Sequence, residues 1–564
     1  MHSNVIEPSR FSPAEADFEA IVVGAGIGGL YQLYRLKALG LRVRLLEAGS
    51  DVGGAWFWNR YPGARFDSES YSYAYSFSED LLQDWDWSEH FAPQAETLRY
   101  LQHVTDRFDL RRHIDFDSLV QDARFDPASQ RWTITTAHGT CYTTRYFILA
   151  IGSLTVPQFP RIPGVDRFAG ESHHTARWPT SPVSFEGKRV AVIGTGATGV
   201  QTIQEVAKTA SHLTVFQRTP NFCVPLNNSK IAAEEQAGLK TGYPAIFERC
   251  RQTSGWFIHH PDPRSVFDVP EAEREVFFEA RYGEPGLSLW QANFRDIMTD
   301  PKANAIITEF VSRKIRARVN DPAVAEKLIP KNHGFGTRRV PLETRYYEVY
   351  NQPNVTLVDL LATPIKQITE TGIQASSGFH ELDMIIYATG FDAITGSFDR
   401  MNISGVDGQT LRAKWEEGPE SFLGLMVSGF PNMFMPGGPL SAVGNFPRAL
   451  EYHVDWITDL VQFMAKRGLG VADAKPQAER EWTDHAREVA TVLLGSQVDS
   501  WMTGVNTNKE GRQVRVASIY RGGGEAFRKK SEAVAANDYP EVSFQPLTLS
   551  EAASQPTAEA SAAD

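Results

Sequence analysis

The sequence predicts an α/β protein with two Rossmann-like domains and an inserted helical subdomain, and three observations support this prediction. A strand, a glycine-rich turn, a helix and a second strand follow one another at residues 20–47. The same order returns at residues 187–218, and a charged, helix-patterned stretch fills about 225–335. Because a strand–helix–strand unit places its two strands in parallel, two copies predict two largely parallel sheets covered by helices.

The first copy begins with AIVV at residues 20–23, which is uniformly apolar, as expected for a strand that is covered on both faces. Gly24, Gly26 and Gly29 then form the pattern G-x-G-x-x-G. Such glycines permit a tight turn and let a diphosphate lie against the N-terminus of the next helix. Glu47 ends the following strand, where a carboxylate binds ribose hydroxyls. A glycine turn without a ligand explains the motif alone equally well, but not the motif together with its strand, helix and acid.

The second copy carries another glycine turn at residues 194–199, but its second strand ends in Phe216-Gln217-Arg218-Thr219 without an acid. An arginine at this place suits the 2′-phosphate of NADPH, because its planar guanidinium binds phosphate oxygens in pairs. One acidic and one basic dinucleotide-binding site predict FAD in the first domain and NADPH in the second. In such a pair, hydride passes to the flavin.

The remaining patterns set the domain organisation. Residues 123–153 alternate with period two and predict an antiparallel meander that returns to the first sheet. Strands are expected again at 354–360 and 383–390, and a long helix at about 448–466. The prediction is therefore an FAD-binding domain in two parts (1–155 and 389–545), an NADPH-binding domain in two parts (156–224 and 335–388), a helical subdomain inserted in the latter (225–334) and a disordered tail (546–564).

Composition excludes several classes of protein. No apolar run reaches the ~18 residues of a membrane span, and the first twenty residues lack the features of a secretory signal. The three cysteines, Cys141, Cys223 and Cys250, lie too far apart for a dithiol or thiolate zinc motif, so disulfide reduction is excluded. A net charge of −12 argues against nucleic-acid binding. We therefore expect a cytoplasmic protein with neither a membrane nor a nucleic-acid partner.

Three further stretches carry reactive residue types. Residues 53–70, GGAWFWNRYPGARFDSES, contain Arg65 and Asp67, and residues 334–343, GFGTRRVPLE, place Arg338 and Arg339 in a glycine-flanked loop. Residues 168–179, FAGESHHTARWP, contain two adjacent histidines. Neighbouring side chains of an extended segment point to opposite faces, and no third ligand is spaced nearby, so we expect no metal site.

In these stretches the chain resembles the Baeyer–Villiger monooxygenases, flavoproteins that insert one oxygen atom beside a ketone carbonyl. Their fingerprint F-x-G-x-x-x-H-x-x-x-W-P matches residues 168–179, and their second signature matches 53–56, 61–63 and Asp67. The resemblance covers about residues 18–540. The stretches FQRTPN, YYEVYNQPNVTLVD and ATGFD look closest to the cyclopentanone and larger cycloalkanone branch.

The resemblance implies a reaction and the residues that perform it. NADPH would reduce FAD, O2 would form a C4a-peroxyflavin, and a small neutral ketone would become an ester or lactone while NADP+ stays bound. Arg339 would be the catalytic arginine that stabilises the peroxide and its ketone adduct, with Asp67 holding it. Alternatively, Arg339 would bind phosphate together with its neighbour Arg338. Arg338 itself stands at a position where the family usually has lysine. His174 would couple domain movement, or be only a packed linker histidine.

The contacts expected from motifs and resemblance fall into four groups. Those to FAD are Gly24, Gly26, Gly29, Glu47, Gly54, Ala55, Trp56, Asp67, Tyr73, Val120 and Phe446. Those to NADP are Arg65, Gly194, Thr195, Gly196, Ala197, Thr198, Gly199, Arg218, Thr219, Arg338, Arg339 and Trp501. The ketone pocket would comprise Ser441, Ala442, Val443 and Phe446, and the domain-coupling fingerprint Phe168, Gly170, His174 and Trp178.

Two other functions remain open at this point. A flavin monooxygenase that hydroxylates nitrogen or oxidises sulfur would share both glycine turns and the histidine, but usually lacks Trp178-Pro179 and the Arg339 loop. A non-enzymatic NADPH-binding redox sensor would need neither an arginine beside the flavin nor an enclosed pocket. Ketone-dependent consumption of NADPH would separate the enzyme from the sensor.

Overall fold

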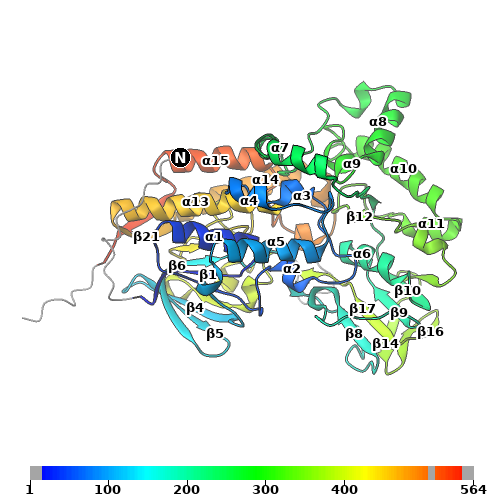
Figure 1. Ribbon diagram of the computed structural model, residues 1–564, viewed down its shortest axis with the longest axis horizontal. Coiled ribbons are helices and arrows are strands. Elements are labelled where there is room, and N and C mark those ends of the chain that lie inside the picture. Colours follow the sequence, from blue (N-terminus) through cyan, green and yellow to red (C-terminus); the bar gives the residue numbers. More distant parts are fainter. Residues whose placement is uncertain (1–15, 506–514, 549–564) are drawn as a thin grey trace, which may run out of the picture.

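The computed structural model describes residues 16–505 and 515–548. Two sheets stand at opposite ends of the molecule, and a group of helices lies above the second sheet (Figure 1). The predicted α/β architecture with two Rossmann-like units and a helical insertion is confirmed. Residues 1–15 of the expected first domain and 549–564 of the expected tail lie outside the described residues.

The first sheet has a parallel core and an antiparallel extension. Its order is β19-β4-β5-β6-β1-β2-β3, and β20 also pairs with β6. β1 is parallel to β2 and β6, whereas β4, β5 and β6 are antiparallel and form the expected meander. The bounds are β1 Phe18–Val23, β2 Val43–Leu46, β3 Ile114–Asp115, β4 Val120–Asp126, β5 Arg131–Thr136, β6 Cys141–Leu149, β19 Asn402–Ser404 and β20 Met433–Phe434.

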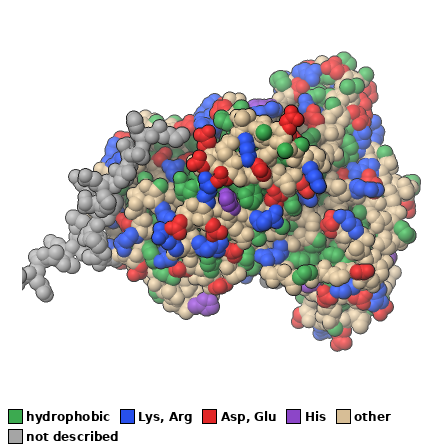
Figure 2. Space-filling model, viewed as in Figure 1, with side chains coloured by type: hydrophobic (Ala, Val, Ile, Leu, Met, Phe, Trp, Pro, Cys, Tyr) green, Lys and Arg blue, Asp and Glu red, His purple; other side chains and the backbone are tan. Residues whose placement is uncertain are grey.

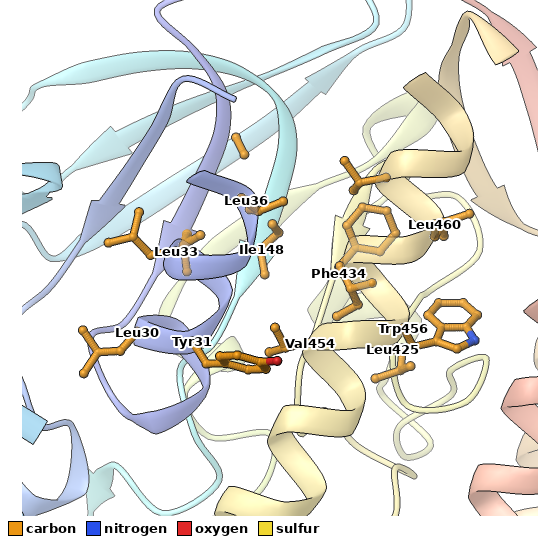
Figure 3. Close-up of a cluster of buried hydrophobic side chains, with 14 of the residues drawn as sticks. Leu30, Tyr31, Leu33, Leu36, Ile148, Leu425, Phe434, Val454, Trp456 and Leu460 are labelled. Carbon is orange, nitrogen blue, oxygen red and sulfur yellow. The ribbon is translucent and has the colours of Figure 1, made fainter. Parts of the chain in front are cut away.

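Helix α13 (Phe446–Arg467) joins this sheet to the C-terminal half of the chain. It packs beside α1 (Ile27–Ala38), and Figure 3 shows side chains of both helices meeting those of β6 and β20 in one buried cluster. Fully burying a Leu or Val side chain contributes about 1.5–3 kcal/mol, so this cluster fixes segments that lie four hundred residues apart in the sequence. The predicted long helix at 448–466 is confirmed.

The second sheet is entirely parallel, with the order β13-β10-β9-β17-β8. Its strands are β8 Glu171–His174, β9 Arg189–Ile193, β10 His212–Gln217, β13 Val355–Asp359 and β17 Met384–Tyr387, with α6 (Ala197–Val206) between β9 and β10. A three-stranded antiparallel sheet follows β13: β14 Ile365–Thr369, β15 Gly372–Ala375 and β16 Gly378–Glu381.

Two chain segments cross between the large sheets, and they pair where β7 (Val156–Pro157) meets β18 (Phe391–Asp392).

Helices connect and cover the two sheets. Those that belong to the first half are α2 Ala55–Trp58, α3 Ser70–Tyr73, α4 Glu79–Asp84 and α5 Gln94–Arg107. The insertion between β11 (Val224–Pro225) and β12 (Leu342–Glu343) contains α7 Ala233–Arg251, α8 Glu271–Gly283, α9 Ser288–Gln291, α10 Pro301–Arg318 and α11 Pro322–Leu328. The C-terminal part adds α12 Leu411–Lys414, α14 Pro476–Thr491 and α15 Gly524–Ala536.

The C-terminal end of the described chain corrects one expected boundary. β22 (Val542–Pro546) pairs with β21 (Leu469–Ala474), and the Leu547 N–H donates to the Gly468 carbonyl oxygen. Backbone pairing therefore continues past residue 545, so residues 546 and 547 belong to the folded part of the chain rather than to the predicted tail. Within the described residues, no helix is long and apolar enough to cross a bilayer. The face in Figure 2 mixes Lys and Arg with Asp and Glu side chains.

Candidate functional site

One large cavity lies between the two sheets and reaches under the inserted helices. Its volume is about 1950 Å³, and both glycine turns, the Asp67 segment and the Arg338-Arg339 loop line it. A pocket for one small ligand usually measures about 300–1,000 Å³. The cavity therefore has room for two nucleotides and a further small molecule.

The first glycine turn forms a site for a diphosphate. Gly26 precedes α1 and lines the cavity with Ile27 and Gly28; no side chain caps this helix end and its first turn contains no acid, so its first N–H groups are available to an anion. A Cβ on Gly29 would lie 1.8 Å from the Gly24 carbonyl oxygen, which shows that this glycine permits close packing of helix on strand. Gly29 itself does not line the cavity, whereas the other ten residues expected at FAD do.

Glu47 is buried at the end of β2, and its carboxylate closes the glycine turn. One oxygen accepts from the Ala25 N–H at 2.6 Å and the other from the Gly49 N–H at 2.7 Å. Burial raises the pKa of Glu47, and these backbone N–H groups oppose that rise. The residue thus supports the turn and also lines the cavity, where a ribose would lie. This arrangement fits the adenosine diphosphate part of FAD.

The second glycine turn has the same construction. Gly196 precedes α6 without a side-chain cap, and a Cβ on Gly199 would lie 2.2 Å from the Gly194 carbonyl oxygen. Gly194, Thr195, Gly196, Ala197, Thr198, Thr219 and Trp501 line the cavity, whereas Gly199 lies behind the turn. The repeated geometry gives a second nucleotide site in the same cavity.

Two arginines lie together beside this second turn. Burial lowers the pKa of Arg218, and burial together with the nearby Arg218 lowers the pKa of Arg338. The Nε of Arg338 is buried and has no hydrogen-bond partner among the described residues. Two guanidinium groups that repel each other and keep unused donors are suited to an anion with several oxygens. These residues fit the 2′-phosphate of NADPH.

Arg339 points to a different part of the site from its neighbour. Its Nη2 atom donates to Asp67 Oδ2 at 2.7 Å, which joins two segments that lie far apart in the sequence. Asp67 is 6% exposed, and its Oδ1 atom has no partner among the described residues. Burial raises the pKa of Asp67, and the Arg339 charge opposes this rise. The pair therefore places a fixed cation at the cavity wall.

Some of the remaining residues predicted to contact a ligand line the cavity, and others do not. Arg65 lines the cavity, but its guanidinium donates to Glu89 and to the Phe91 carbonyl oxygen, both at 3.1 Å. Val443 and Phe446 line the cavity, whereas Ser441 and Ala442 are buried behind it, 1% and 2% exposed. The expectation that Ser441 and Ala442 line the ketone pocket is wrong, because their loop packs against residues 518–520.

The fingerprint residues do not line the cavity: Phe168 and Gly170 precede β8, His174 ends it and Trp178 follows it. Nδ1 of His174 accepts from the Ala176 N–H at 3.0 Å, and its Nε2 lies 3.4 Å from both the Gln158 carbonyl oxygen and Thr389 Oγ1. Gln158 and Thr389 belong to the two segments that cross between the large sheets. Burial lowers the pKa of His174 to about 4, so this side chain is neutral near pH 7 and donates from Nε2.

Two other fingerprint positions are explained by packing. A Cβ on Gly170 would lie 2.7 Å from the Phe168 ring, so the glycine makes space for the aromatic side chain two residues earlier. Trp178 is buried against His173, with ring centroids 5.1 Å apart. The spacing of this motif therefore builds a compact junction beside the second sheet.

Some cavity residues carry no sequence motif. Phe257, Leu287 and Trp290 come from the inserted subdomain, and Tyr520 and Arg521 come from the segment before α15. Within the first group, only Phe257 lies in a stretch with a recognisable pattern, the aromatic residues beside a glycine in SGWF, residues 254–257. Nothing in the local pattern marks the second group, because the fold alone brings these segments to the cavity.

Comparison with known proteins identifies relatives along nearly the whole chain. A family model described as pyridine nucleotide-disulphide oxidoreductase matches residues 21–234. A 2-oxo-Δ3-4,5,5-trimethylcyclopentenylacetyl-CoA monooxygenase of Pseudomonas putida is 44% identical over 94% of this chain and 98% of its own. A Baeyer–Villiger monooxygenase of Pseudooceanicola batsensis is 39% identical over 89% of this chain and 92% of its own. The crystal structure of OTEMO in complex with FAD and NADP superposes with a TM-score of 0.91, at 42% identity over 94% of this chain and 100% of that one.

Proposed function

Because this chain belongs to the Baeyer–Villiger monooxygenases, flavoproteins that insert an oxygen atom from O2 beside a ketone carbonyl, we propose that the Arg339–Asp67 pair is its catalytic centre. The protein uses FAD and NADPH, and it forms an ester or lactone from a ketone. The single observation that carries the assignment of the centre is the 2.7 Å contact that places Arg339 at the wall of the cavity shared by both nucleotide sites.

Bound FAD supplies the redox chemistry: it accepts hydride from NADPH and activates O2. Arg339 stabilises negative charge on the reacting oxygen atoms and on the carbonyl oxygen of the ketone, because its guanidinium is held in place before the reaction begins. Asp67 orients Arg339, and as a buried carboxylate it keeps a counter-charge beside the guanidinium. Arg218 and Arg338 hold the 2′-phosphate of the coenzyme, and Trp501 faces it from the C-terminal loop.

The cavity walls support a small ketone. Phe257, Leu287 and Trp290 are apolar side chains of the inserted subdomain. Val443 comes from the loop before α13, and Phe446 is the first residue of that helix. Such walls exclude water and bind a carbon ring. The three unpaired cysteines, of which Cys223 and Cys250 are buried, support a reducing compartment such as the cytoplasm.

A panel of cyclic, linear and aryl ketones tests this function directly. We expect at least one ketone to yield a product that is heavier by one oxygen atom, with NADPH consumed and O2 as the oxygen source. Mass spectrometry must identify the ester or lactone, because release of hydrogen peroxide also consumes NADPH. Oxidation of amines or sulfides, without an ester or lactone from any ketone, would favour the nitrogen- or sulfur-oxidising alternative.

We further propose that His174 couples the two domains, because it contacts both segments that cross between them. His174→Ala should retain FAD but give less ester per NADPH consumed, since it loses contacts worth about 0.5–1.5 kcal/mol each. The measurement is the ratio of ester to hydrogen peroxide at saturating NADPH. His173→Ala is the matched control, because this neighbouring ring packs against Trp178 and Glu171 instead. An unchanged ratio in His174→Ala would assign the residue to packing alone.

A further inference from the structure

Arg521 is a cation in the active-site cavity that has no carboxylate partner among the described residues. It lines the same cavity as Arg339, and its side chain donates to the Met502 sulfur at 3.0 Å. No carboxylate of the described residues forms an ion pair with it. Burial lowers the pKa of Arg521, and no acid is among the causes of its shift. A thioether is a weak acceptor, so no strong acceptor among the described residues occupies this guanidinium.

The backbone around Arg521 is held firmly on both sides. The Tyr520 N–H donates to the Ser441 carbonyl oxygen at 3.1 Å, and the Leu440 N–H donates to the Ser518 carbonyl oxygen at 3.0 Å. Three residues further on, the Gly524 N–H donates to the Ser254 carbonyl oxygen at 2.7 Å. The Tyr520 ring stacks on Trp482 with centroids 4.8 Å apart. Arg521 is thus carried on a segment fixed between two parts of the fold that border the cavity.

Four other arginines that line the cavity already have assignments. Arg339 is paired with Asp67, Arg65 with Glu89, and Arg218 and Arg338 suit the 2′-phosphate. Arg521 lies in a different segment, next to the loop of Val443 and beside Met502, which follows the expected coenzyme contact Trp501. A partly buried guanidinium without an acid partner is stabilised by an anion that reaches it, and its fork of N–H groups matches a carboxylate or phosphate.

We propose that Arg521 binds an oxyanion on the substrate, so that the preferred ketones carry a carboxylate or phosphate group. This inference rests on the proposed function, since it names the substrate class of the same cavity. It replaces the neutral ketone expected from the sequence with a molecule that has a neutral ring against the apolar walls and an anionic arm at Arg521. Either a free acid or the phosphates of a coenzyme A thioester would supply that oxyanion.

The test compares three forms of one substrate: a cycloalkanone with a carboxymethyl group, its methyl ester and its coenzyme A thioester. We expect the holoenzyme to show at least a tenfold higher kcat/KM for the acid or the thioester than for the methyl ester. Arg521→Gln should lower that value about 10- to 100-fold, with the methyl ester unchanged, because one charge-assisted contact is lost. Arg521→Lys should restore part of it. Preference for the acid would identify a carboxylate site, and preference for the thioester a phosphate site.

Arg295→Gln is the matched control, because Arg295 also lines the cavity but is exposed. The ratios of kcat/KM among the three substrate forms should be the same for Arg295→Gln as for the unaltered protein. Equal kcat/KM for all three forms in the unaltered protein would overturn the inference. A rise in the KM for NADPH as the sole effect of Arg521→Gln would also overturn it, and would assign the residue to the coenzyme.

A binding measurement separates this inference from the proposed function. The dissociation constant of the keto acid for the FAD- and NADP+-loaded protein is obtained by equilibrium dialysis, which requires no turnover. Weaker binding of the acid to Arg521→Gln than to the unaltered protein supports the oxyanion site, even if no ester or lactone forms. Absence of product from every ketone would count against the reaction, whereas equal binding by both proteins would count against the site.

Discussion

Arg339→Ala should lose ester or lactone formation almost completely while the protein still binds FAD. Removing one preorganised group that stabilises developing negative charge commonly costs about 100- to 1,000-fold in rate, or about 3–4 kcal/mol. The side chain contacts Asp67 at the cavity wall and is partly exposed there, so the fold does not depend on it for burial of apolar surface. The measurements are anaerobic reduction of the flavin by NADPH, followed by ester and hydrogen peroxide in air.

Two variants sharpen this test. Asp67→Asn should reduce the same step by a smaller factor, since it keeps the shape of the side chain but removes the charge that orients Arg339. Arg295→Ala removes another arginine from the same cavity and should leave ester formation near its original rate. If Arg339→Ala makes ester or lactone at nearly the original rate, Arg339 is not the catalytic residue. The second assignment, a phosphate-binding arginine beside Arg338, would then stand.

The double variant Arg218→Ala with Arg338→Ala should abolish the preference for NADPH over NADH. Each charge-assisted hydrogen bond to the 2′-phosphate contributes roughly 1.5–3 kcal/mol, so each single variant should lose about 10- to 100-fold in kcat/KM for NADPH. Arg218 lies close enough to Arg338 to lower its pKa, so the effects of the two substitutions should not add fully. The measurement is kcat/KM for each coenzyme in the anaerobic reduction of FAD.

NADH provides the internal control for this prediction. It has no 2′-phosphate, so its kcat/KM should change little in the same variants. Equal efficiency with NADPH and NADH in the unaltered protein would contradict the assignment of both arginines. An equal loss with both coenzymes would instead indicate that Arg218 and Arg338 contact a part that the two coenzymes share.

Sequence periodicity and glycine spacing were sufficient for the architecture because they report local chemistry. The two glycine turns, the meander at β4–β6 and helix α13 each follow from residues that are near one another in the chain. The roles of Gly29 and Gly199 are also local, since each lies against the carbonyl oxygen of the first glycine in its own turn. The predicted limit at residue 545 was wrong because β22 pairs with β21, about seventy residues earlier.

The sequence by itself determined the two nucleotide sites and the family resemblance, because these depend on short motifs. Only the tertiary structure decided which side chains share the cavity. Ser441 and Ala442 sit in a motif-bearing loop, yet they lie behind the wall because residues 518–520 cover that loop. Arg521 belongs to no motif, yet it enters the cavity because its segment is bonded to Ser441 on one side and Ser254 on the other. Local patterns cannot specify such placements, since contacts between segments distant in sequence depend on how the whole core packs.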